Sequence, residues 1–109
     1  MIYELRIYHA MPGRLPALLA RFENHTLRIW EKHGIRQAGF WTTLIGESES
    51  NQLTYLLAWD NLAERQERWN AFLADPEWIA TKTETEKDGS LVQNIRNELL
   101  APTAFSSVK

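Results

Sequence analysis

The stretch Ile2-Tyr3-Glu4-Leu5-Arg6-Ile7-Tyr8-His9 decides the fold, because its side chains alternate between two unlike sets. Such alternation is typical of a β-strand with two different faces. One face carries Tyr3, Leu5, Ile7 and His9, and the other carries Glu4, Arg6 and Tyr8. Because apolar side chains are the usual occupants of a core, we expect the first set to face the helices and the second to lie on the opposite side of the sheet.

After this first strand, apolar residues recur at the spacing of a helix. A helix is expected from about Arg14 to about His33, since apolar residues recur there every three or four positions while Arg21 falls on the exposed side. Two strands are expected next, over Ile35 to Gly46 and over about Gln52 to Trp59, with a hairpin loop at 47–51 between them.

The last third of the chain predicts a second helix and a final strand. Asn61 is a suitable N-cap, Asp75-Pro76 restarts the helix, and Gly89 suits its end, so this helix is broken or bent. Ser90 to Leu100 then alternates as a strand. The order βαββαβ predicts an α+β, ferredoxin-like fold, in which a four-stranded antiparallel sheet carries both helices on one face. We expect one domain over residues 1–101 and a short C-terminal tail over 102–109.

The amino-acid composition excludes several classes of function. The 109 residues include 44% hydrophobic residues, enough for one packed core. The net charge is −2 and the basic residues are scattered, so nucleic acid is not an expected partner. The chain has no cysteine, which excludes disulfides and thiol chemistry. No run of about 20 apolar residues predicts a membrane span, and no signal segment is visible at the N-terminus, so a cytoplasmic location is expected.

The bare face of the sheet predicts a homodimer. With both helices on one side, the face carrying Glu4, Arg6 and Tyr8 would be buried only by a second subunit packed about a two-fold axis. In the last strand, Arg96 and Glu98 alternate in step with that face, so we expect opposite charges to pair there across the strands. The expected dimer face therefore consists of Glu4, Arg6, Tyr8 and Arg96.

Several short motifs occur in a specific order along nearly the whole chain. They are Tyr3-Glu4-Leu5-Arg6, Gly13 before the first helix, Gly39-Phe40-Trp41, Asn51 in the hairpin, and Asp75-Pro76-Glu77-Trp78. In this order and spacing the chain resembles the NIPSNAP family. The resemblance implies a dimeric α+β barrel built from ferredoxin-like subunits. It implies no common catalytic residues, because the wider group includes both enzymes and subunits of unknown chemistry.

Histidines are the first candidates for chemistry in a chain without cysteine. His25 and His33 stand eight residues apart, about 12 Å along a helix, so they do not share a metal ion, and we expect no metal site. The second helix also lacks a histidine where haem-degrading relatives of the group would carry an iron ligand, so we expect no cofactor. His25 and His9 remain as candidate catalytic bases.

Aromatic residues are the candidates for ligand binding. Their rings provide area and stacking for a flat organic molecule, although core packing explains most of them equally well. The candidates are Trp41, Tyr55, Trp59 and Trp69. Trp41, on a strand, is expected to be more buried than Trp30 and Trp78, which lie near helix ends.

Three hypotheses for function remain. The first is a dimeric protein that binds a small apolar or aromatic molecule between sheet and helices. The second is a cofactor-independent monooxygenase or isomerase acting on an aromatic or polyketide-like substrate, with His25 or His9 as base. The third is a non-catalytic structural or partner-binding subunit. An enclosed cavity that contains a histidine would favour the first two.

Overall fold

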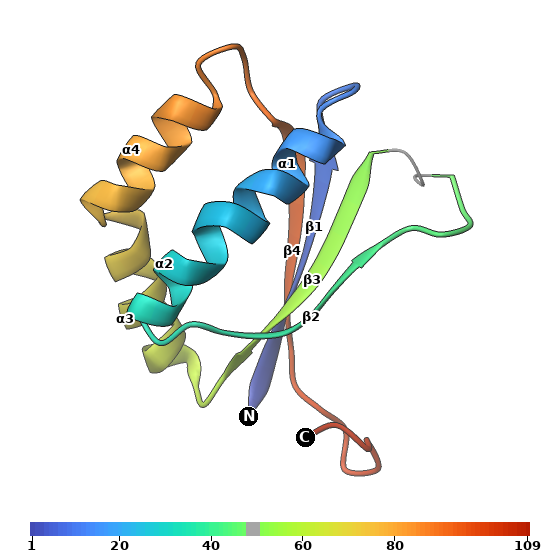
Figure 1. Ribbon diagram of the computed structural model, residues 1–109. Helices are drawn as coiled ribbons and strands as arrows, with labels where there is room; N and C mark the ends of the chain where they lie inside the picture. The colour runs from blue at the N-terminus through green and yellow to red at the C-terminus, as the bar shows by residue number, and fades with distance from the viewer. Residues whose placement is uncertain (48–50) are drawn as a thin grey trace.

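The computed structural model describes residues 1–47 and 51–109, and it has the expected α+β, ferredoxin-like architecture (Figure 1). Four antiparallel strands form one sheet in the order β2-β3-β1-β4. All helices lie on the same side of this sheet (Figure 1). The elements are β1 (Ile2–Ala10), α1 (Leu15–Arg21), η1 (Phe22–Thr26), α2 (Leu27–Lys32), β2 (Arg36–Thr42), β3 (Gln52–Trp59), α3 (Leu62–Leu73), α4 (Pro76–Thr85) and β4 (Val92–Leu100).

Local sequence signals explain where the helices begin and end. The side chain of Asn61 accepts a hydrogen bond from the backbone N–H of Glu64, which starts α3, and Asp75 caps α4 in the same way through Glu77. Gly34 ends the first helical run with a φ of 70°, a conformation that glycine adopts without steric cost. The expected break in the second helix is therefore present between α3 and α4.

The expected facing of β1 is wrong. Glu4 has no exposed surface and Arg6 and Tyr8 are each 8% exposed, because all three side chains point toward the helices. Their partners in β3 are Leu57, Tyr55 and Leu53, which belong to the core. The polar side chains are accommodated because they bond to one another. Tyr3, Leu5 and Ile7 instead lie half-buried on the face without helices, which we call the open face.

The expected charge pairing on β4 is wrong for the same reason. Arg96 pairs with Ile7 and Glu98 with Leu5, so both charged residues lie on the open face and not beside Glu4 and Arg6. They are exposed and contact each other at 3.6 Å. The predicted alternation of side chains along β4 is confirmed. The prediction assigned these side chains to the wrong faces because it inferred the faces of β4 from those of β1.

Smaller differences concern the ends of elements and single residues. The second strand ends at Thr42 and not at Gly46. The expected hairpin loop at 47–51 includes residues 48–50, which lie outside the described residues. Arg21 is not on the exposed side of its helix, since it is 5% exposed.

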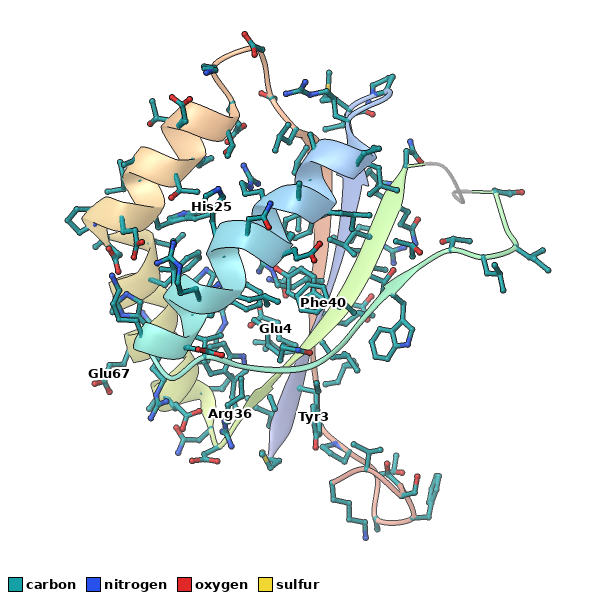
Figure 2. The ribbon with its side chains drawn as sticks, in the orientation of Figure 1. Tyr3, Glu4, His25, Arg36, Phe40 and Glu67 are labelled. Carbon is teal, nitrogen blue, oxygen red and sulfur yellow. The ribbon has the colours of Figure 1, made fainter. Side chains whose placement is uncertain are left out.

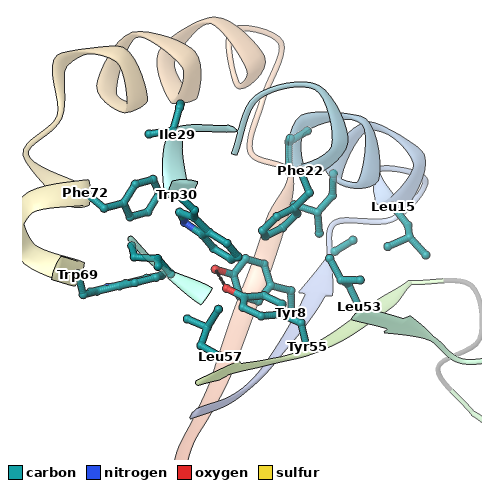
Figure 3. Packing of buried hydrophobic residues seen from close by; sticks show 14 of the residues in the cluster. Tyr8, Leu15, Phe22, Ile29, Trp30, Leu53, Tyr55, Leu57, Trp69 and Phe72 are labelled. Carbon is teal, nitrogen blue, oxygen red and sulfur yellow. Dashed lines mark hydrogen bonds between the residues drawn. The ribbon is translucent and has the colours of Figure 1, made fainter. Parts of the chain in front are cut away.

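The core is an aromatic cluster between the sheet and the helices (Figure 3). Trp30 is 2% exposed and contacts rings from the sheet and from α3, whereas Trp41 is 51% exposed, so their expected order of burial is reversed. Beyond β4, residues 101–109 extend away from the helices (Figure 1). In the described part of the chain, none of the helices combines the length and apolar character needed to cross a membrane.

Candidate functional site

A buried carboxylate organises the helix-covered face of the sheet. Glu4 lies between the sheet and the helices (Figure 2). Its Oε1 accepts hydrogen bonds of 3.0 Å from the indole N–H of Trp59 and from Nε of Arg65. Its Oε2 accepts from Arg6 and Arg65 at 3.0 Å and from Asn97 at 2.7 Å. Both carboxylate oxygens are therefore fully engaged, and Glu4 has a structural role in holding Arg6.

Arg6 links this hydrogen-bond network to two tyrosines. Its Nε donates to the Tyr55 hydroxyl at 2.9 Å, and its Nη2 lies 3.4 Å from the Tyr8 hydroxyl. Tyr55 in turn donates to Tyr8 at 2.9 Å, the bond drawn as a dashed line in Figure 3. The ring of Trp69 covers the guanidinium, with 4.6 Å between the guanidinium carbon and the ring centroid.

The network fixes the charge states of its members. Burial alone would raise the pKa of Glu4, but hydrogen bonds from Arg65 and Asn97 and the charges of both arginines lower this pKa to about 2. Burial would lower the pKa of Arg6, yet Tyr55, Tyr8 and Glu4 raise it above its ordinary value. Burial raises the pKa of Tyr55 well above that of a free phenol. At neutral pH the group is thus a carboxylate, a guanidinium and a neutral phenol.

A cavity of about 580 Å³ lies above Arg6 and Tyr8, between the sheet and the helices. This volume is in the range of small-molecule sites in proteins. Its wall is largely aromatic and comes from η1, α2, α3 and α4; the rings are Phe22, Trp30, Trp69, Phe72 and Trp78. Arg21, Lys82 and Glu86 lie at its charged side, where Arg21 contacts Glu86 at 3.2 Å. The cavity extends to the edge strand β4, where Ile95 is 44% exposed.

The helical wall of the cavity contains a π turn. In η1 the backbone N–H of Leu27 bonds to the carbonyl of Phe22, five residues earlier, and the hydroxyl of Thr26 donates to the carbonyl of Arg21 at 3.4 Å. The extra residue of this wider turn places Arg21, Phe22 and Thr26 together on the cavity. Such turns occur often at functional sites in other proteins.

The candidate bases lie elsewhere. His25 lines a separate hollow of about 200 Å³ beside Asn24 and Leu91. His9 lies in β1 opposite Asn94, on the open face with Leu5 and Ile7. Among the residues lining the main cavity that the structure describes, there is no histidine. Over residues 1–47 and 51–109, no three His, Asp or Glu side chains gather as a metal site would need.

The candidate ligand-binding aromatics take four different positions. Trp69 lines the cavity. Tyr55 is fully buried beneath it and acts through its bonds to Arg6 and Tyr8. Trp59 is also fully buried and is bound to Glu4. Trp41 lines a different groove, of similar volume, between η1 and β2.

The sequence reasoning missed Arg6, Tyr8, Arg21 and Trp30 as cavity residues. One signal was available, since Glu4, Arg6 and Tyr8 alternate with aliphatic residues in a strand that the topology places at the centre of the sheet. Three polar groups at such spacing can satisfy each other inside a protein. For Arg21 and Trp30 no such signal existed, because their position depends on the π turn.

The fold and the cavity define a class: a ferredoxin-like α+β domain with a ligand-sized, aromatic cavity between one face of its sheet and its helices. The family model described as NIPSNAP matches residues 3–107, and the chain therefore belongs to the NIPSNAP family, as the motifs of the sequence indicated. No protein of curated function matches the chain.

Solved structures agree with this assignment. A NIPSNAP family protein of unknown function from Agrobacterium tumefaciens is 28% identical, with a TM-score of 0.85 over 100% of this chain and 94% of that one. A NIPSNAP-like domain protein from Burkholderia xenovorans is 30% identical, with a TM-score of 0.82 over 96% and 87% of the two chains. A Deinococcus radiodurans protein, whose proposed activity is that of an antibiotic biosynthesis monooxygenase, shares the fold at 14% identity, with a TM-score of 0.65 over 100% and 99%.

Proposed function

We propose that this protein binds a flat aromatic molecule in the cavity between the sheet and the helices. The observation that carries the proposal is the wall of five aromatic side chains around a volume of about 580 Å³. Aromatic rings bind planar ligands by stacking and by burial of apolar surface. A floor held rigid by the bonds of Arg6 to Glu4 and Tyr55 adds a fixed polar contact for orientation.

We propose further that the protein acts as a homodimer joined through the open face. Apolar side chains meet there across the strands: Leu5 pairs with Leu56, and Trp41, 51% exposed, lies in the neighbouring edge strand. The ring of Trp41 lies over Gly39, where a Cβ atom would meet the ring at 2.5 Å. A two-fold pairing of two such faces would bury surface that no helix covers.

Binding can be tested by isothermal titration calorimetry with 2-naphthoate, a probe with two fused rings. For 13 non-hydrogen atoms we expect one site per chain with a Kd on the order of 0.1 mM. Trp78→Leu removes an aromatic wall of the cavity and should weaken binding about fivefold or more. Trp41→Leu is the matched control, because it changes the same residue type outside the cavity.

Two results would contradict the proposal. One is the lack of saturable heat up to about 5 mM probe, which would exclude a useful aromatic site. The other is a loss of affinity in the Trp41→Leu variant with none in Trp78→Leu, which would assign binding to the groove beside β2.

A further inference from the structure

We infer that the ligand of this cavity is acidic, an aromatic carboxylate whose oxygens bind at the floor formed by Arg6 and Tyr8. The inference rests on the proposed function, which concerns the rings of the ligand, and adds the chemistry of its polar end. It follows from the hydrogen-bond donors and the charges that surround the cavity.

Tyr8 offers a hydroxyl proton to the cavity. Its oxygen accepts from Tyr55 at 2.9 Å and lies 3.4 Å from Nη2 of Arg6, so its own proton has no acceptor among the described residues. Among the described residues Nη2 of Arg6 has only that long contact, whereas Nη1 and Nε have shorter ones. Tyr8 and Arg6 thus present two adjacent donors, and both residues line the cavity.

The net charge of the side chains around the cavity is positive, which is the sign that an acidic ligand needs. Glu4 is shared by Arg6 and Arg65, which leaves one positive charge on that group. Glu86 neutralises Arg21, and Lys82 adds a further cation at the mouth. A chain with a net charge of −2 therefore concentrates positive charge at this site. A carboxylate accepts from several donors at once and complements this charge, whereas an uncharged amide supplies one acceptor and adds donors.

The test compares 2-naphthoate with 2-naphthamide, which has the same rings and an uncharged head. By calorimetry at neutral pH we expect the carboxylate to bind at least tenfold more tightly, with an affinity that falls as salt is raised. Equal affinities, or tighter binding of the amide, would overturn the acidic ligand and leave the proposed aromatic site intact. Failure of both probes to bind would overturn the proposed function itself.

Tyr8→Phe tests the floor, with Tyr3→Phe on the open face as the matched control. We expect Tyr8→Phe to weaken naphthoate about tenfold and naphthamide less than threefold, while Tyr3→Phe changes neither. An equal loss of affinity for both probes would mean that Tyr8 supports the fold and does not bind the carboxylate, which contradicts the inference. If Tyr8→Phe does not fold by circular dichroism, Lys82→Met removes a cation that lines the same cavity. It should weaken naphthoate more than naphthamide, and unchanged selectivity there would count against the inference.

Discussion

Glu4 accepts five hydrogen bonds from four side chains although its own side chain has no exposed surface. A lone buried carboxylate would take up a proton, because desolvation disfavours its charge. Here two arginines, an asparagine and an indole replace the lost water, so the carboxylate stays ionised and holds Arg6 under the cavity. Removing Glu4 would leave the buried guanidinium of Arg6 without a carboxylate partner.

The pH dependence of stability tests this role of Glu4. Its pKa is about 2 in the folded chain and 4.5 as a free side chain, so its contribution is complete above about pH 5 and is lost as the pH falls toward 2. Between pH 6 and pH 2 we expect the wild type to lose about 3 kcal/mol more unfolding free energy than Glu4→Gln. Urea unfolding at several pH values measures this. Parallel pH profiles for the two proteins would show that Glu4 is not stabilised as a carboxylate.

Single residues also mark the limit of sequence reasoning. The alternation from Ile2 to His9 correctly predicted a strand with two faces, but hydrophobicity alone assigned the wrong face to the core. Leu5 and Ile7 look like core residues by type, and Glu4 and Arg6 look like surface residues. Their true positions depend on partners that come from distant segments, such as Tyr55, Arg65 and Asn97, which only the assembled sheet brings near them.

Among the elements, the first helix matters most for the site because it is not a regular α-helix. The sequence predicted one continuous helix, and the structure has α1, η1 and α2 in direct succession. Apolar spacing of three and four residues is compatible with a single wider turn, so no local signal distinguished it. The turn rotates the preceding residues relative to α2, so that Arg21 and Phe22 line the cavity together with Trp30.

Deletion of Asn24 tests the function of this turn. Asn24 is exposed and lies within η1, so its removal should leave a regular α-helix in place of the π turn. We expect unchanged helical content by circular dichroism, a melting temperature lower by roughly 5–10 °C, and naphthoate affinity at least tenfold weaker, because Phe22 and Arg21 move. Asn24→Ala is the control and should bind normally. Full naphthoate affinity in the deletion variant would show that binding does not require the π turn.

At the scale of the whole molecule, the sheet separates two kinds of surface. Its covered face holds the polar network and the aromatic cavity, and its open face holds Tyr3, Leu5, Ile7 and Leu56 at strand-to-strand contacts. The order of elements and the antiparallel sheet could be predicted from periodicity, capping residues and turn signals, since these are local. The cavity could be placed only approximately, between sheet and helices, because its lining combines residues from seven separate elements.

The dimer is tested by introducing a charge on the open face. Leu56 lies at the centre of that face opposite Leu5, so Leu56→Glu should place two like charges near the two-fold axis and yield monomers. Ile79→Glu on α4, at a side chain that is 52% exposed, is the control and should leave the oligomeric state unchanged. Light scattering coupled to size-exclusion chromatography gives the mass. A monomeric wild type at about 50 µM, or a dimeric Leu56→Glu variant, would contradict an interface through this face.

A crystal structure of the protein with 2-naphthoate shows where the ligand binds, because the described part of the chain has two hollows of similar volume, about 580 Å³ each. We expect density for the probe in the cavity above β1, with its rings beside Trp69 and Trp78. Its carboxylate should lie about 3 Å from the Tyr8 hydroxyl and from Nη2 of Arg6. Density in the groove between η1 and β2, with the cavity holding only water, would contradict the proposed binding site.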